Sequence, residues 1–189
     1  MSPLHAVFEH TYDEIVRLHR QVFQLWLTHV VFTWRWWIAL MCATVPWMLW
    51  LLWRNRASSG RLLCAGFFIA ALAEWLDSAG VALGLWHYDN EILPMMPSFL
   101  PWDLTLYPVT LMTFLQVKPH GSRYLKAALF GALVAFIAEP LFKWIGLYHP
   151  DHWRHLYTFV LLFLIYLAAD GLTRLPFHPL PPPSDRRHR

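Results

Sequence analysis

The sequence predicts an all-α membrane protein, in which a polytopic bundle of five transmembrane helices follows an amphipathic N-terminal interfacial helix. Three observations support this fold class. Of the 189 residues, 57% are hydrophobic and only 14% are charged, whereas soluble domains carry about 25% charged residues. The apolar residues form blocks of roughly 16 to 25, long enough to cross a hydrocarbon core of about 30 Å. Polar or helix-breaking stretches separate these blocks.

Three regions follow from this pattern. Residues 1–33 are expected to form the interfacial helix, because apolar side chains recur there at steps of three and four with charged side chains between them. Docking of this helix on a protein partner is the alternative. Residues 34–174 contain the five expected spans, and residues 175–189 form a proline-rich, basic tail that we expect on the cytoplasmic side.

The five spans are expected at Trp34 to Trp53, Leu62 to Trp86, Pro101 to Val117, Leu125 to Leu147 and His155 to Leu172. The third span is the shortest of them. It begins near Asp103 and contains Pro108. A proline frees one helix carbonyl, which neighbouring helices must then satisfy inside a membrane.

Basic residues predict the orientation. Most of the 15 lysine and arginine residues fall on the side of the loop 54–61, the loop 118–123 and the C-terminal tail, and basic residues favour the cytoplasmic side. We therefore expect a multi-pass protein of the cell membrane with its N-terminus outside and its C-terminus in the cytoplasm. Tryptophans near the span ends are expected to anchor it at the two interfaces, namely Trp34, Trp36, Trp37, Trp50, Trp53, Trp86, Trp102, Trp144 and Trp153.

The formal net charge of +3 is explained by this topology and implies no nucleic-acid partner. Membrane lipids are the expected partners, and the sequence identifies no protein partner.

Carboxylates inside the spans carry the strongest functional signal. Asp77, Asp103 and Glu139 are expected at similar depths in the outer half of the bundle, with Glu74 on the same helix face as Asp77. Buried charges are costly in a membrane and usually face the bundle interior. We take Asp77, Asp103 and Glu139 as candidate acid–base residues. Lys143 follows Glu139 by four residues, so we expect it to pair with Glu139 or with another of these acids.

The segment 84–104 combines three prolines with many apolar side chains. It cannot be one continuous helix and is too apolar for a free loop, so we expect it to fold back as a cap over the outer mouth of the bundle, with His87, Tyr88, Asp89 and Asp103 bordering the acids. The candidate substrate-binding residues are Glu74, His87, Tyr88, Trp102, Gln116, Lys143, Trp153 and Tyr157.

Histidines raise the question of a metal. His149, His152 and His155 recur every three residues beside Asp151, and His87 and Asp89 are expected on the same side of the membrane, so imidazole and carboxylate ligands could converge on a zinc-like ion. These residues do not form a closed ligand set at a known spacing. The sequence therefore predicts no metal and no cofactor, and it has no phosphate-binding loop or serine nucleophile motif.

Two segments resemble each other. The stretch "IAALAEWLDSAGVALGLWHYD" is similar to "LVAFIAEPLFKWIGLYHPD" once about three residues are omitted. The match aligns Glu74 with Glu139, and it aligns residues 84–87 with residues 146–149. It predicts a duplicated two-helix unit, which would bring the two glutamates to equivalent depths.

The runs "PWMLWLLW", "LDSAGVALGLWHYDNEILPMMPSFLPWDLTLYPVTLMTFLQ" and "AFIAEPLFKWIGLYHPDHWRHLYTF" resemble an uncharacterised family of small five-helix integral membrane proteins from Gram-positive, often spore-forming, bacteria. The resemblance covers roughly residues 34 to 165 and implies a five-helix fold without implying an activity. The positions similar to the family's polar pattern are Asp77, Tyr88, Asp103, Pro108, Gln116, Glu139, Pro140, Trp153 and Tyr157. Thr158 replaces an expected serine. Glu74 lies outside the pattern, which ranks it below Asp77 and Asp103.

A looser resemblance links the predicted helix bundle to membrane carotenoid cyclases and hydratases, which place acids, tryptophans and tyrosines near one membrane face. Three functions therefore remain open. The polar core is structural or binds a partner; or it is an intramembrane acid–base site for an isoprenoid or lipid substrate; or it carries protons or cations. Polar residues toward the inner side of Glu74 are scarce, which counts against the carrier.

Overall fold

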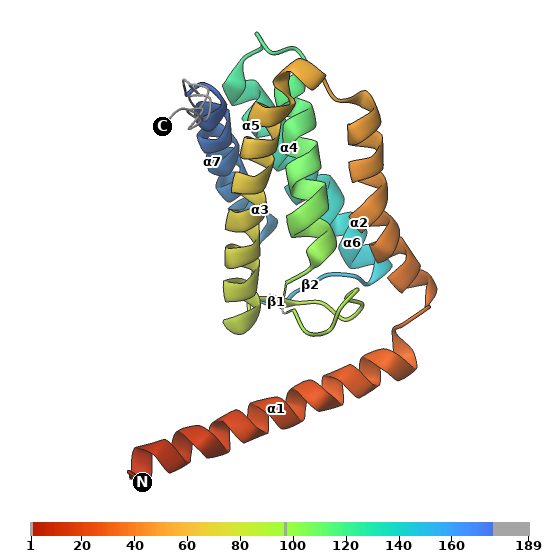
Figure 1. Cartoon of the computed structure of the whole chain (residues 1–189), viewed down its shortest axis with the longest axis vertical. Helices are drawn as coiled ribbons and strands as arrows, with labels where there is room; N and C mark the ends of the chain where they lie inside the picture. Colours follow the sequence, from red (N-terminus) through yellow and green to blue (C-terminus); the bar gives the residue numbers. More distant parts are fainter. Residues whose placement is uncertain (1, 97, 176–189) are drawn as a thin grey trace, which may run out of the picture.

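The computed structural model describes residues 2–96 and 98–175 and shows a helical bundle with one short β-ribbon (Figure 1). Most of the expected tail therefore lies outside the described residues. The elements are α1 (Pro3–His29), α2 (Trp34–Trp53), η1 (Arg56–Ser58), α3 (Ser59–Ala82), β1 (Trp86–His87), η2 (Trp102–Leu106), α4 (Tyr107–Gln116), α5 (Arg123–Leu133), η3 (Val134–Ala138), α6 (Glu139–Ile145), β2 (His149–Pro150) and α7 (His155–Thr173).

Four helical segments are long and apolar enough to cross a membrane. They are Trp34–Trp53, Arg56–Ala82, Arg123–Ile145 and His155–Thr173. Large apolar side chains on their outer faces are exposed, including Leu52 at 86%, Trp75 at 79% and Trp144 at 83%. Such a surface is unusual for a protein surrounded by water, and it supports the assignment as a membrane protein.

The third expected span is shorter than the other four. The helical segments η2 and α4 together cover residues 102–116, which corresponds to about 22 Å at 1.5 Å per residue. This segment packs between α2 and α3 (Figure 1), and its Leu111 and Met112 are fully buried. It is a central helix of the bundle, and it is shorter than the hydrocarbon core of a typical bilayer, which is about 30 Å thick.

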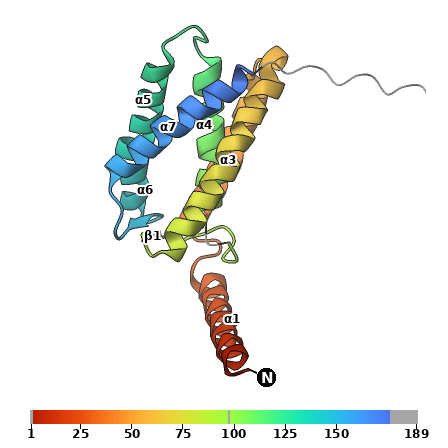
Figure 2. The ribbon, with the colours of Figure 1, turned by 90° about the vertical axis from the view of Figure 1, so that its left-hand side faces the viewer.

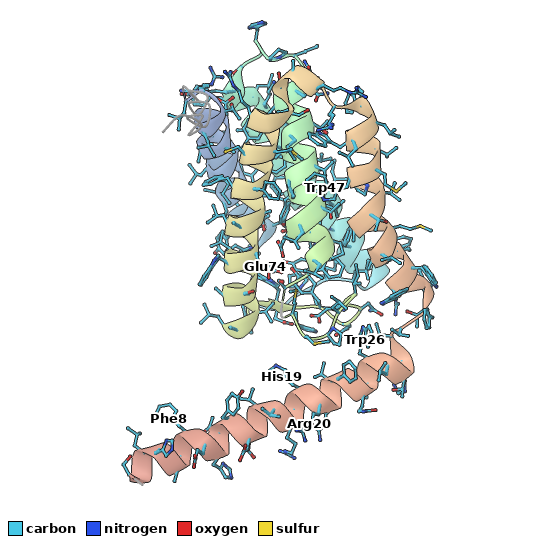
Figure 3. The ribbon with its side chains drawn as sticks, in the orientation of Figure 1. Phe8, His19, Arg20, Trp26, Trp47 and Glu74 are labelled. Atoms are coloured by element: carbon cyan, nitrogen blue, oxygen red, sulfur yellow. The ribbon has the colours of Figure 1, made fainter. Side chains whose placement is uncertain are left out.

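Two π-helical segments precede prolines. The backbone N–H of Tyr107 donates to the carbonyl of Trp102, and that of Glu139 donates to the carbonyl of Val134. In each case the next residue is a proline, which has no N–H to continue the ladder. The carbonyl of Leu104, four residues before Pro108, instead accepts from Trp47 Nε1 of α2 at 2.9 Å. A neighbouring helix thus satisfies the carbonyl that the proline leaves without a helical partner, as the sequence predicted; Trp47 is labelled in Figure 3.

The loops 83–101 and 146–154 meet at one end of the bundle, which we call the ribbon end. There β1 pairs antiparallel with β2, and the carbonyl of Leu85 accepts from the N–H groups of Asp151 and His152 at 3.0 and 2.9 Å. Helix α1 crosses beneath this end (Figures 1 and 2). Its Trp26 Nε1 donates to the carbonyl of Glu91 at 2.8 Å (Figure 3).

The expectation that tryptophans act as interfacial anchors is correct only in part. Trp34, Trp53 and Trp144 are exposed, but Trp50 is 1% exposed and Trp102 is 3% exposed. Trp86 is also buried. Trp86 is part of the bundle interior because the loop that carries it folds inward, and Trp102 is part of it because η2 packs between α2 and α3.

Candidate functional site

A cavity of about 60 Å³ lies inside the bundle near the ribbon end. This volume exceeds what one water molecule needs. Its lining contains three carboxyl groups and no lysine or arginine. The lining residues are Ala73, Leu76, Asp77, Trp86, Tyr88, Trp102, Asp103, Tyr107, Glu139, Tyr148, Trp153, Thr158, Leu161, Leu162 and Ile165. The structure therefore brings together Asp77, Asp103 and Glu139, as the sequence predicted.

Asp77 organises the cap over the cavity. Its Oδ1 accepts from Trp86 Nε1 at 2.5 Å and from Tyr88 OH at 2.8 Å, and its Oδ2 accepts from the backbone N–H of Phe99 at 2.8 Å. A carboxylate with three donors is well satisfied although it is buried. Gly80, one turn further along α3, leaves room for the Trp86 ring, which a Cβ atom at that position would overlap.

Asp103 differs from Asp77. It lies within the π-helical segment η2 and is 1% exposed, and its buried Oδ2 has no hydrogen-bond partner among the residues that the structure describes. An ionised carboxylate without partners costs several kcal/mol in a low-dielectric interior. A π-helical turn often marks a functional position, and here it directs a carboxyl group into the cavity.

Glu139 is held at the end of the second π-helical segment. It is 4% exposed, and its Oε2 lies 2.5 Å from Nδ1 of His155 at the start of α7. The His155 side chain is 34% exposed, so the pair connects the cavity wall with the protein surface. The expected pair with Lys143 is not formed. Lys143 is exposed and makes no ion pair with any acid in the described part of the chain, because His155 occupies that place on Glu139.

Glu74, labelled in Figure 3, has contacts that differ from those of the other acids. One of its oxygens accepts from Ser98 Oγ at 2.5 Å, and its Oε2 is buried without a partner among residues 2–96 and 98–175. It does not line the cavity. Its bond to Ser98 fixes the cap to α3, which agrees with the lower rank that the sequence gives this glutamate.

The other predicted substrate contacts divide into two groups. Tyr88, Trp102 and Trp153 line the cavity. Of the remaining four, His87 lies on the outside of the β-ribbon, Lys143 and Tyr157 are exposed, and Gln116 binds the backbone of Asn55 at the opposite end of the bundle.

Sequence reasoning missed two tyrosines of the cavity wall, Tyr107 and Tyr148, and the partner histidine of Glu139. Tyr107 directly precedes Pro108. A proline inside a predicted span is the feature of the sequence that could have drawn attention to Tyr107.

Of the three tyrosines that line the cavity, Tyr88 and Tyr148 lie in loops. Burial and the nearby Asp77 raise the pKa of Tyr88 well above its usual value, and burial together with Glu139 raises the pKa of Tyr148. Both hydroxyl groups are therefore protonated near neutral pH and can act as hydrogen-bond donors. The cavity thus combines carboxyl groups, neutral donors and aromatic faces.

No protein-family model, curated protein or solved structure matches the chain. The resemblance to the five-helix family therefore stays a prediction, and the functional assignment depends on the geometry of the site.

Proposed function

We propose that the chain is a five-span protein of the cell membrane with α1 in the interface and the ribbon end outside. The short segment formed by η2 and α4 would be the fifth span, inside the ring of longer helices. The basic residues Arg54, Arg56, Lys118 and Arg123 gather at the opposite end, as expected for a cytoplasmic face. The apolar side chains of α1 would enter the lipid beside the bundle.

Cysteine labelling tests this orientation. Met95 is 75% exposed at the ribbon end, and His120 is exposed in the loop at the opposite end. In a variant without Cys42 and Cys64, Met95→Cys should react with an impermeant maleimide on intact cells, and His120→Cys should react only after lysis. The reverse pattern would invert the orientation.

We further propose that the cavity is an intramembrane acid–base site for an isoprenoid or another unsaturated lipid. The unpartnered carboxyl of Asp103 supports this proposal most strongly. A protonated acid in an apolar cavity can donate to a carbon–carbon double bond. The faces of Trp86, Trp102 and Trp153 can then stabilise the positive charge that forms on carbon.

The reaction would balance through Glu139. The proton from Asp103 forms a new C–H bond, and the resulting cation either loses a proton from a neighbouring carbon or is captured by water. The carboxylate of Glu139 accepts the released proton in both cases and exchanges it with solvent through His155, and a proton taken up from solvent restores the acid form of Asp103 for the next turnover. The product is an isomer of the substrate or the substrate plus one water. The apolar part of the lining comes from α3 and α7, so the hydrocarbon chain would enter between these helices.

A purely structural polar core is the second candidate. It is favoured at Asp77, whose carboxylate is saturated by bonds that hold the cap. The carrier has less support, because several large buried side chains toward the opposite end are apolar, including Ile69, Leu111 and Phe130, and the buried polar groups there include Tyr166 and Asp170.

Comparison of cellular lipids tests the enzymatic proposal. Lipid extracts from cells that produce the wild-type chain should contain an isomerised or hydrated isoprenoid or lipid, detected by chromatography and mass spectrometry. Cells that produce Asp103→Asn at the same membrane level should lack it. Identical lipid profiles in the two strains and in cells without the protein would contradict the enzymatic proposal and favour the structural core.

A further inference from the structure

Three potential metal ligands meet on the outer face of the β-ribbon. The antiparallel register places His87 directly opposite His149, and their rings stack with centroids 5.0 Å apart. Asp89, two residues after His87, reaches both rings. One ligand atom from each of the three side chains lies within 4.8 Å of the others. His87 and His149 are also the equivalent positions of the two similar segments in the sequence, so the pairing brings matched residues together.

A neighbouring carboxylate orients the first histidine. Asp151 Oδ2 lies 2.7 Å from His87 Nδ1. The carboxylate favours a proton on Nδ1, which leaves the lone pair on Nε2 facing Asp89, whose Oδ1 is 3.7 Å away. Metal-binding histidines are commonly held in this way by a carboxylate behind the ring.

The second histidine has an unsatisfied nitrogen. His149 Nε2 is buried and has no hydrogen-bond partner among the described residues, although Asp89 Oδ2 lies only 3.0 Å away. The distance is short enough, but the atoms are not aligned for a hydrogen bond. A metal ion between them would satisfy both the nitrogen and the carboxylate.

The local charge also favours a cation. Ion pairs of Asp89 and Asp151 in the described chain involve histidines alone. Glu91 adds a third acid two residues after Asp89. A divalent ion would offset the repulsion among these groups.

We propose that His87, Asp89 and His149 bind a divalent first-row transition metal ion, for which Zn²⁺ is the best fit. Two imidazoles and one carboxylate are suitable Zn²⁺ ligands, at about 2.0 to 2.2 Å each. The side chains must therefore move inward by about 1 Å. Their exposure of 37 to 57% leaves room for this movement and for a water molecule as fourth ligand.

Such an ion would clamp the two loops that close the cavity. His87 follows Trp86, which donates to Asp77, and His149 follows Tyr148, which lines the cavity. A metal between the strands would fix both aromatic residues in place. This role does not depend on the reaction proposed for the cavity.

Zinc titration of the full chain in detergent tests the proposal. The protein is purified through a tag without histidines, stripped with a chelator, and titrated with Zn²⁺ against a chromophoric competitor. The wild type should bind one ion tightly. The variant His87→Gln/His149→Gln should lose this site, and Asp151→Asn should bind about 10- to 100-fold more weakly, because it removes only the support of His87.

Two matched controls keep the outcome clear. His152→Gln alters a histidine of the same loop outside the cluster and should bind as the wild type does. Asp89→Asn changes an exposed side chain, so it should fold normally yet bind much more weakly. Zn²⁺ should also raise the melting temperature of the wild type and not of Asp89→Asn. Equal Zn²⁺ affinity in the wild type, the double variant and Asp89→Asn would overturn the proposal.

Discussion

Asp77→Asn should lower the free energy of unfolding by about 3 kcal/mol, because charge-assisted hydrogen bonds contribute about 1.5 to 3 kcal/mol and an orphaned donor is costly. The amide oxygen can still accept from Trp86 and Tyr88, but the amide NH₂ would then face the backbone N–H of Phe99. Either amide orientation leaves at least one donor unpaired. Thermal or denaturant unfolding in detergent, followed by tryptophan fluorescence, measures the loss.

The matched control is Asp103→Asn. Both aspartates line the same cavity and both are buried, but Asp103 Oδ2 has no partner to lose among the described residues. Its substitution should change the free energy of unfolding by less than about 1 kcal/mol. Equal destabilisation by the two variants would mean that the hydrogen bonds of Asp77 to the cap do not stabilise the fold more than Asp103 does.

Asp103→Asn should instead abolish conversion of the lipid substrate. The amide keeps the size of the side chain but cannot donate the proton, and loss of general acid catalysis lowers rates by about 10²- to 10⁴-fold. Conversion in membranes that contain equal amounts of folded wild-type and variant protein is the measurement.

Glu139→Gln offers a second variant of the same kind. It should also lose conversion, because the base and its link to His155 are removed. A variant at Asp103 that retains full conversion would exclude this residue as the acid. Loss of conversion that merely follows loss of folded protein would favour the structural core.

The membrane class and the long helices could be predicted from composition and block length, because both depend on local and additive properties of the chain. Four candidate spans agree with the expected boundaries to within several residues. The position of the third segment in the bundle was harder to predict. Its length could be counted, but its central position between α2 and α3 depends on packing against residues distant in sequence.

The carboxyl cluster was also predictable, since buried acids must face the bundle interior. The detailed partners were not. The spacing of four residues favours Lys143 as the partner of Glu139. In the structure, His155 from α7 is the partner instead. This contact could not be predicted, because only the tertiary fold brings the two helices together. Trp86 was expected at the membrane interface, but the left-handed turn at Gly84 directs the chain back so that this ring bonds Asp77. Such reversals depend on single backbone angles that composition does not encode.

The acid–base function requires a proton on Asp103, and infrared spectroscopy detects such a proton directly. Infrared difference spectroscopy of the purified wild type near neutral pH should show the C=O stretch of a protonated carboxylic acid shielded from water. This band should disappear in Asp103→Asn and persist in Asp13→Asn, which alters an exposed aspartate of α1. A wild-type spectrum without the band, or a band unchanged in Asp103→Asn, would show that Asp103 does not hold the proton and would contradict the acid–base function proposed for the cavity.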